Sequence, residues 1–355
     1  MHHYLAGVVK QLLIVILDSL TPELREVVNF HLKKIRAPVQ IGKLSKEAKF
    51  YPHWKCKDFE NFALYFSIPV FTAVIDDQSL LEDWALLVDS LHVALRMDIT
   101  IQEIEYANAK LNAFMRDISE VYTLKEATFN AHQTTHLMQS VYDWGPLWAH
   151  SAFCFETWNM YLVNSIHSEK GIILQVLRAM NLRRFEQILQ AMMGPTADEI
   201  VKSYCQRLKC SRPNGVVTID KISYLGKKQK VDVELVRKFN IKSSMEQFSR
   251  CIIKGCSFMN DKKENARSCN YFAQLKGGQY IKISHFLVDF LNKDQLTVCR
   301  TIDVVHNRFS ETVMEIKSFS DQEFLVRTDD IETICVQVDI DNLKYITPVP
   351  NQLHY

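Results

Sequence analysis

The sequence predicts an α+β protein in which a mostly helical N-terminal domain precedes a small β-rich C-terminal domain. Apolar residues recur at helical spacing through the first 195 residues, whereas short runs of β-branched and aromatic residues follow from about Cys251. A polar, basic segment separates the two patterns. We therefore expect a helical domain over residues 1–195, a basic connector over 196–250 and a β-rich domain over 251–355.

The N-terminal helices begin at sequence patterns that cap a helix. In Thr21–Glu23, a hydroxyl N-cap precedes a proline at the first helical position and an acid near the positive end of the helix dipole. Leu24–Ile35 then has helical spacing, and Leu80–Leu95 repeats it. Thr100–Glu103 is a capping box, and the apolar stripe behind it ends at Ile118. These segments predict three amphipathic helices.

One further helix is expected over Ala127–Tyr142. Gly145 and Pro146 follow it, and neither residue continues a helical hydrogen-bond ladder without cost. The helix is therefore expected to end just before them.

The C-terminal region is predicted to form a small sheet or barrel, because several short strands lie at close spacing between turn signals. Gly277-Gly278 and Asp341-Asn342 are two of these turns. The expected strands are Tyr271–Leu275, Tyr280–Ile283, Leu296–Ile302, Thr312–Ile316 and Ile334–Val338.

The net charge of +1 hides an uneven distribution. Residues 1–199 hold 18 Lys+Arg and 23 Asp+Glu, residues 200–263 hold 15 and 5, and residues 264–355 hold 9 and 13. A basic middle between mildly acidic flanks is suited to contact a polyanion locally.

The nine cysteines are scattered, and the apolar stretch Leu12–Leu17 lacks the basic start and the cleavage site of a signal peptide. A reducing compartment, nuclear or cytoplasmic, is therefore expected. The longest uncharged run, Asn61–Ile75, has 15 residues and contains Pro69, which is too short for a membrane span. No membrane association is expected.

Four segments carry a resemblance to a known family. Met1–Lys10 (MHHYLAGVVK) resembles a segment in which Asp-Pro-Met-His leads into a Gly-x-x-Lys helix. Phe129–Leu137 fits a Phe-Asn-x-His…His-Leu pattern, and Gly145–Asn159 fits Gly-Pro-Leu-Trp…Ser-x-Phe-x-Phe-Glu-x-x-Asn. The tail Tyr345–Asn351 fits Tyr-x-x-Pro-x-Pro-Asn. In this order the segments resemble the C-terminal half of a CACTA-like (CMC group) DDE cut-and-paste DNA transposase.

The resemblance implies a ribonuclease-H-like fold with a large helical insertion before the last catalytic acid. Glu156 matches the position of that acid and would be a metal ligand, with Asn159 one turn further along its helix. Such enzymes use two divalent ions, held by clustered carboxylates, to activate the attacking oxygen and stabilise the leaving one, and Mg²⁺ suits oxygen ligands and phosphate.

The sequence departs from the family pattern in one serious respect. The Asp of Asp-Pro-Met-His would stand before Met1, and the two earlier aspartates are also missing. One carboxylate does not hold two metal ions, so we expect the chain to be inactive alone. The alternative is a non-catalytic DNA- or protein-binding module derived from a transposase.

Two residues carry the catalytic hypothesis, and each has a simpler interpretation. Glu156 is also the kind of residue that the dipole favours in a helix's first turn. The resemblance places His2 near the scissile phosphate, whereas the simpler interpretation, which we favour, is an exposed residue at a frayed terminus. If both belong to one catalytic core, they should lie close together in space. If the preceding sheet is missing, an apolar face that includes Phe153 or Phe155 should be exposed.

Other possible metal ligands have weaker support. His132 and His136 share a helix face, but Gln133 stands where a zinc protease has glutamate, so a structural role is the alternative. Two cysteine pairs could supply four thiolates to zinc, although their spacing is wider than in zinc knuckles. These cysteines are Cys205, Cys210, Cys251 and Cys256.

A basic stretch within residues 227–242 is the candidate DNA-binding segment. It would neutralise phosphates of DNA, either nonspecifically or at transposon ends, but such a run is also typical of a solvated surface. Its cations are Lys227, Lys228, Lys230, Arg237, Lys238 and Lys242. A homo-oligomer is a further possibility for a protein of this family.

Overall fold

The computed structural model describes residues 3–41, 51, 53–192, 198, 216–261 and 268–351. It divides the chain into two compact units. Unit 1 combines Met1–His150 with Val216–Tyr355, and unit 2 is Ser151–Gly215. Each unit is described by itself below.

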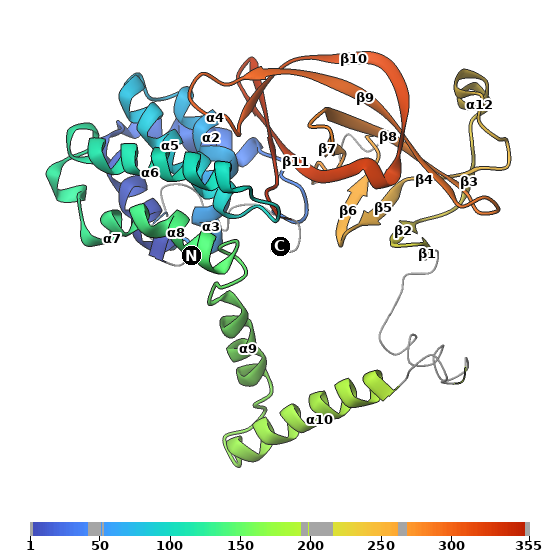
Figure 1. Ribbon diagram of the computed structural model, residues 1–355, viewed down its shortest axis with the longest axis horizontal. Helices are drawn as coiled ribbons and strands as arrows, with labels where there is room; N and C mark the ends of the chain where they lie inside the picture. Colours follow the sequence, from blue (N-terminus) through green and yellow to red (C-terminus); the bar gives the residue numbers. More distant parts are fainter. Residues whose placement is uncertain are drawn as a thin grey trace. The chain divides into compact units, whose positions relative to one another are not determined.

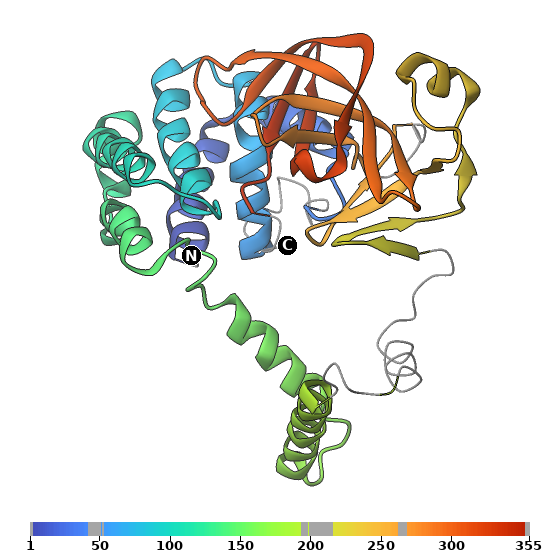
Figure 2. The ribbon, with the colours of Figure 1, turned by 45° about the vertical axis from the view of Figure 1, so that its right-hand side comes forward.

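The helices of unit 1 gather beside its β structure (Figures 1 and 2). Their longest pair is α5 (Gln78–Ala94) with α6 (Ile101–Val121), which pack along each other. The Thr100–Glu103 capping box is formed as expected, because the Thr100 side chain accepts from the Glu103 amide and the Glu103 carboxylate accepts from the Thr100 amide.

Shorter helical segments surround this pair. Thr21 caps α2 as expected, accepting a hydrogen bond from the Leu24 amide. The segment expected as one helix over Ala127–Tyr142 is divided into α7, a 3₁₀ turn and α8, and Gly145, with φ 83°, ends it. The bounds are η1 His3–Val9, α1 Lys10–Ser19, α2 Pro22–Lys34, η4 Leu124–Glu126, α7 Phe129–His132, η5 Gln133–His136 and α8 Leu137–Trp144.

The centre of the helical part is a continuous buried segment made of α3 (Cys56–Asn61), η3 (Phe62–Phe66) and α4 (Ser67–Thr72). Residues 58–71 are all buried, and most of them are apolar, which is typical of a helix enclosed by its neighbours. The Trp84 indole donates to the Ser67 hydroxyl at 2.8 Å, so the largest buried side chain of α5 is also fully paired.

Six antiparallel strands form a closed barrel in the order β8-β7-β11-β12-β10-β9, with β9 pairing back to β8. Closure leaves no exposed edge within this ring. Lys293 and Asp341, both with positive φ, occupy the tight turns after β8 and β11. The strands are β7 Phe272–Leu275, β8 Tyr280–Asp289, β9 Asp294–His306, β10 Met314–Arg327, β11 Ile331–Ile340 and β12 Leu343–Pro348.

Six further strands and one helix flank the barrel. A separate antiparallel sheet has the order β1-β2-β5-β6, while β3 and β4 extend the barrel sheet from β8. Helix α12 lies between β3 and β4 in the chain. The bounds are β1 Val216–Ile219, β2 Ile222–Leu225, β3 Gln229–Lys230, α12 Val233–Phe239, β4 Glu246–Phe248, β5 Arg250–Ile253 and β6 Cys256–Met259.

The helices and the barrel of unit 1 are joined by buried hydrogen bonds. Asp89 on α5 accepts from the Ser310 hydroxyl at 2.6 Å and from the Thr312 hydroxyl at 2.8 Å. His92 Nε2 donates to the Pro348 carbonyl at 2.9 Å. Because these partners come from both ends of the chain, neither end forms unit 1 by itself.

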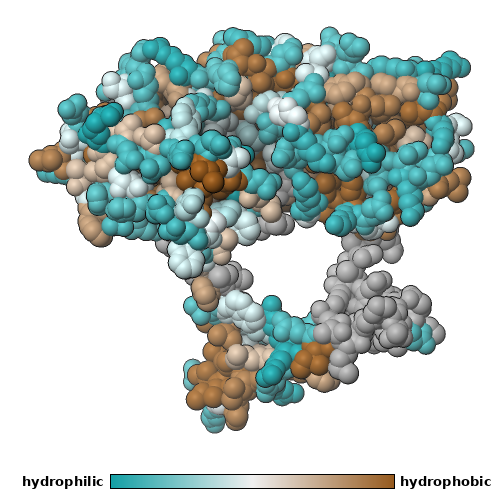
Figure 3. Space-filling view, in the orientation of Figure 1, coloured by the Kyte–Doolittle hydropathy of each residue, from teal (hydrophilic) through white to brown (hydrophobic). Residues whose placement is uncertain are grey.

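Unit 2 contains a helical hairpin of α9 (Phe153–Asn164) and α10 (Ile172–Met192). Gln175 fixes the turn, since its side chain accepts from the His167 amide and donates to the Ser168 and Lys170 carbonyls. Phe155 on α9 is 68% exposed, as expected, whereas the Phe153 side chain is outside the described set. Apolar surface is visible at the turn end of the hairpin in Figure 3.

The predicted fold class is confirmed at the coarse level, with helices in the N-terminal part and sheets in the C-terminal part. The chain is divided differently from the predicted boundaries at residues 195 and 250. Strands β1–β4 and α12 fall within the expected basic connector. The reason is long-range packing, because apolar residues of this segment, such as Tyr224 and Phe248, are buried beside the barrel.

Candidate nucleic-acid interface

The six candidate DNA-binding cations lie on or beside β3 and α12. Lys227 and Lys228 follow Gly226, whose φ of 104° makes the turn after β2. Lys230 is on β3, Arg237 and Lys238 are in the last turn of α12, and Lys242 follows that helix. In Figure 1, β3 and α12 occupy one end of the β structure.

Three of these cations are already paired with carboxylates. Lys228 meets Glu246 at 3.0 Å, and its ammonium also lies 4.1 Å from the centre of the Phe290 ring. Lys238 meets Glu323 at 3.0 Å, and Lys242 meets Asp289 at 3.4 Å. The acids come from strands distant in the sequence, so the positive charge of these three lysines is largely offset locally.

The acids are more buried than their lysine partners. The Glu323 side chain is 14% exposed and that of Asp289 is 2% exposed. Partial burial acts to raise the pKa of Glu323, but Lys238 and Arg300 outweigh it, and the pKa lies below its ordinary value. Both acids are therefore fixed counter-charges that a phosphate would have to displace from the lysines.

Lys227, Lys230 and Arg237 form the remaining group, which we call the open triad. All three are exposed, and none makes an ion pair within the parts of the chain that the structure describes. Opposite charge nearby weakens phosphate contacts, so these cations are the better placed of the six to bind a polyanion.

The structure does not describe the side chains of the two predicted catalytic residues, His2 and Glu156. His2 is outside the described residues, and the expected proximity of His2 to Glu156 therefore stays a prediction. The backbone of Glu156 lies in the first turn of α9, while its side chain is outside the described set. Asn159 is exposed one turn later on the same helix.

Two of the segments that carry the family resemblance pack directly against each other in unit 1. His3 Nε2 donates to the Asn130 carbonyl at 3.1 Å, and the Tyr4 hydroxyl donates to the Gln133 carbonyl at 3.0 Å. The Asn130 side chain also lies beside Gly7. Segments 127 residues apart are thus neighbours.

The structure describes only some of the histidines and cysteines that the sequence suggested as other metal ligands. The rings of His132 and His136 lie 5.3 Å apart edge to face, without a third ligand beside them among the described residues. Cys251 and Cys256 are buried free thiols on β5 and β6, and burial raises the pKa of both. Cys205 and Cys210 are outside the described residues.

Across the described ranges, no three His, Cys, Asp or Glu side chains are grouped to hold a metal ion. Glu156 is the one carboxylate that the resemblance assigns to Mg²⁺ in this chain, and its side chain is not described.

A pocket of about 720 Å³ lies where α5 meets the barrel, and sequence patterns did not indicate it. Val93, Met97 and Pro348 contribute apolar surface, while Lys254 and Asp98 contribute charges. The residues come from separate stretches of the chain between residues 92 and 351, so no local motif marks the site. Its volume falls in the range of small-molecule and peptide side-chain sites.

No family model, no curated protein and no solved structure matches the chain. Within the described ranges, none of the helices has both the length and the apolar character needed to cross a bilayer.

Proposed function

We propose that the chain is the C-terminal part of a DDE-type DNA transposase and contacts DNA through the open triad. The observation that carries the proposal is the contact of His3 and Tyr4 with residues 130–133, which lie in two of the segments that resemble the family. A shared structural role explains why these residue types occur together. In the complete enzyme, Glu156 would contribute the last carboxylate to a Mg²⁺ site.

The DNA contact is expected to be weak, independent of sequence and sensitive to salt. Each phosphate neutralised on duplex DNA contributes about −0.9 to the slope of log affinity against log salt concentration. Replacing the open triad together (Lys227→Gln, Lys230→Gln, Arg237→Gln) should therefore reduce the slope by roughly 2–3. Fluorescence anisotropy of the full chain with labelled duplex, between about 50 and 200 mM salt, measures this slope.

The matched control removes three other exposed lysines with the same change in net charge. Lys34, Lys125 and Lys344 lie on α2, η4 and β12, and none of them is on β3 or α12. The control triple (Lys34→Gln, Lys125→Gln, Lys344→Gln) should keep the parental slope. Equal losses in both triples would assign the effect to net charge and contradict the proposed interface.

The pocket beside α5 favours a second candidate function, a non-catalytic binding module derived from a transposase. Its mixed apolar and charged lining is typical of sites that accept a ligand or peptide side chain. The reading frame upstream of the Met1 codon distinguishes the two candidates. An Asp-Pro immediately before Met1, with two earlier aspartates on β-strand patterns, is expected for the enzyme, and their absence from the transcript would favour the module.

A further inference from the structure

The turn between β8 and β9 presents the most exposed large apolar side chain among the described residues. Leu291 is 87% exposed, whereas the preceding Phe290 is half-buried and its ring centre lies 6.2 Å from that of Phe248. Lys293, with φ 57°, completes the turn. Gly, Asn, Asp and Pro are the usual residues of tight turns, so local turn chemistry does not account for a leucine at this tip.

The backbone of the tip is held in place by Asp289. The carboxylate of Asp289, 2% exposed, accepts from the Leu291 amide at 3.0 Å, from the Asn292 amide at 3.3 Å and from the Asn292 side chain at 2.6 Å. Lys242 pairs with the same carboxylate at 3.4 Å. Because the turn is already ordered, placing the leucine against a partner costs little further conformational entropy.

The turn adjoins the candidate DNA-binding cations. The Lys228 ammonium lies 4.1 Å from the centre of the Phe290 ring. The β3–β4 and β4–β8 pairings place Lys230 of the open triad level with Val288, three residues before the exposed leucine. Lys293 is exposed and makes no ion pair within the described ranges. The apolar tip therefore projects from a basic surface.

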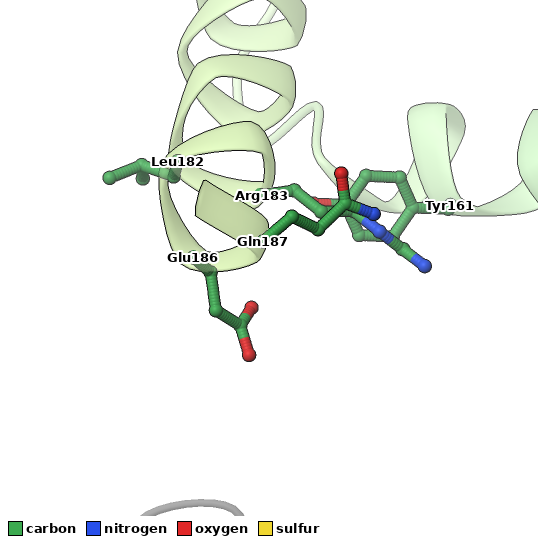
Figure 4. Close-up of a pocket in the computed structure, with 5 residues that line it drawn as sticks. All are labelled: Tyr161, Leu182, Arg183, Glu186 and Gln187. Carbon is green, nitrogen blue, oxygen red and sulfur yellow. The ribbon is translucent and has the colours of Figure 1, made fainter. Parts of the chain in front are cut away.

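Two other exposed leucines have balanced charges around them. Figure 4 shows Leu182 of α10 with Glu186 one turn further on, and an arginine stands one turn before it. Leu343, 44% exposed, lies between Asp341 and Lys344. By contrast, the β8–β9 turn adjoins residues 227–242, which hold six Lys+Arg and two Asp+Glu. Such an excess of positive charge complements a polyanion.

We propose that Leu291 inserts between two stacked base pairs from the minor groove of duplex DNA, an inference that rests on the proposed DNA contact. Proteins that bend DNA insert single apolar side chains such as leucine between base steps, while nearby cations neutralise phosphates. Lys293, two residues from the wedge, contacts a phosphate beside the opened step. One leucine is sufficient for one base step, whereas binding to a membrane surface scales with a larger buried apolar area.

Insertion should add a preference for DNA shape to the phosphate contacts. Unstacking a base step costs free energy, and burial of one leucine side chain offsets much of that cost. Pyrimidine–purine steps such as TA unstack readily, whereas A-tracts are stiff. We therefore expect a duplex with a central TA step to bind about three- to tenfold more tightly than an A-tract duplex. Phosphate contacts alone would not distinguish the two by base identity.

The fluorescence of 2-aminopurine at the single TA step of a short duplex tests the insertion. The full chain should raise this fluorescence, because the base leaves its stack. Leu291→Ala should abolish both the rise and the preference for TA, while the slope of log affinity against log salt stays unchanged because no charge is removed. Leu291→Met should keep the rise, since methionine also serves as a wedge. Leu343→Ala is the matched control at another strand turn and should keep the parental response.

The outcomes separate the insertion from the phosphate contact. A parental chain that binds duplex without the rise, or a rise that persists in Leu291→Ala, would overturn the insertion and leave the open triad to its own test. A parental chain without salt-dependent DNA binding would overturn both. Binding to anionic phospholipid vesicles that Leu291→Ala abolishes, without a rise on DNA, would assign the tip to a membrane surface. Urea unfolding should give Leu291→Ala the parental midpoint, because the side chain is 87% exposed.

Discussion

Asp83 on α5 is almost completely buried, at 3% exposure. Burial raises the pKa of its carboxyl from 3.8 to about 7, the nearby Asp117 charge adds to the rise, and the Tyr122 hydroxyl opposes it. Well below pH 3.8 the Asp83 carboxyl is protonated in both the folded and the unfolded chain, so its raised pKa does not lower the free energy of unfolding there. As pH rises towards 7, only the unfolded state readily loses the proton, and stability falls.

The substitution Asp83→Asn removes this titration while keeping the shape of the side chain. It should raise the free energy of unfolding by on the order of 2–4 kcal/mol at pH 8, with a much smaller change near pH 4. Urea unfolding at the two pH values measures the difference. Glu105→Gln, an exposed carboxylate on α6, is the control and should change stability by less than about 0.5 kcal/mol at both.

Neighbouring lysines of the basic segment differ in whether they pair with an acid. Lys227, Lys228 and Lys230 are nearly adjacent in sequence, yet among the described residues only Lys228 of the three has an ion-pair partner. Its partner, Glu246, is on another strand, and the pairing depends on how β3 and β4 align. Sequence identified the basic segment, whereas its division into paired and open cations required the fold.

At the scale of elements, Asp89 is the principal link between α5 and the loop before β10. Besides the hydroxyls of Ser310 and Thr312, it accepts from the Glu311 amide at 3.0 Å and pairs with Lys110 at 3.1 Å. The side chain is 3% exposed, so these partners replace its water shell. Losing the carboxylate leaves several buried donors without an acceptor.

We expect Asp89→Ala to lower the free energy of unfolding by about 3–5 kcal/mol, the usual cost of removing one partner from a buried charged pair. Asp89→Asn should cost less, because its amide oxygen still accepts a hydrogen bond. Urea unfolding measures both, and Asp143→Ala, at an exposed position on α8, is the control. A loss no greater than that of the control would show that other contacts hold the two elements together.

At the scale of the whole molecule, unit 1 is built from two segments separated by unit 2. The Val39 amide donates to the Asn270 side chain at 3.1 Å, and the buried His92 ring donates to the Pro348 carbonyl. Burial lowers the pKa of His92, which keeps the ring neutral at pH 7. Each segment therefore provides hydrogen-bond partners that the other lacks.

If residues 1–150 and 216–355 are produced as separate chains in one cell, we expect them to co-purify and to unfold in a single cooperative transition. Each segment alone should lack such a transition, because it exposes the surface that the other covers. Affinity capture through a tag on one segment, followed by thermal unfolding, is the measurement. Two segments that purify separately, each with its own transition, would show that they are independent domains.

The sequence by itself determined the features that depend on neighbours within a few residues. The Thr21 cap, the capping box at Thr100 and the helix end at Gly145 are local hydrogen-bond and backbone patterns, and all three are observed. The order of helices followed by strands was equally clear, because helical and strand periodicities differ over a few residues.

Tertiary structure alone decided the features that depend on distant partners. Closure of the barrel requires β8 to pair with β9 while four other strands complete the ring, and Lys238 meets Glu323 across 85 positions. The grouping of the two chain ends into unit 1 depends on Asp89 and its partners more than 200 residues away. Spacing along the chain does not encode such contacts, because they arise only when buried surfaces are matched in space.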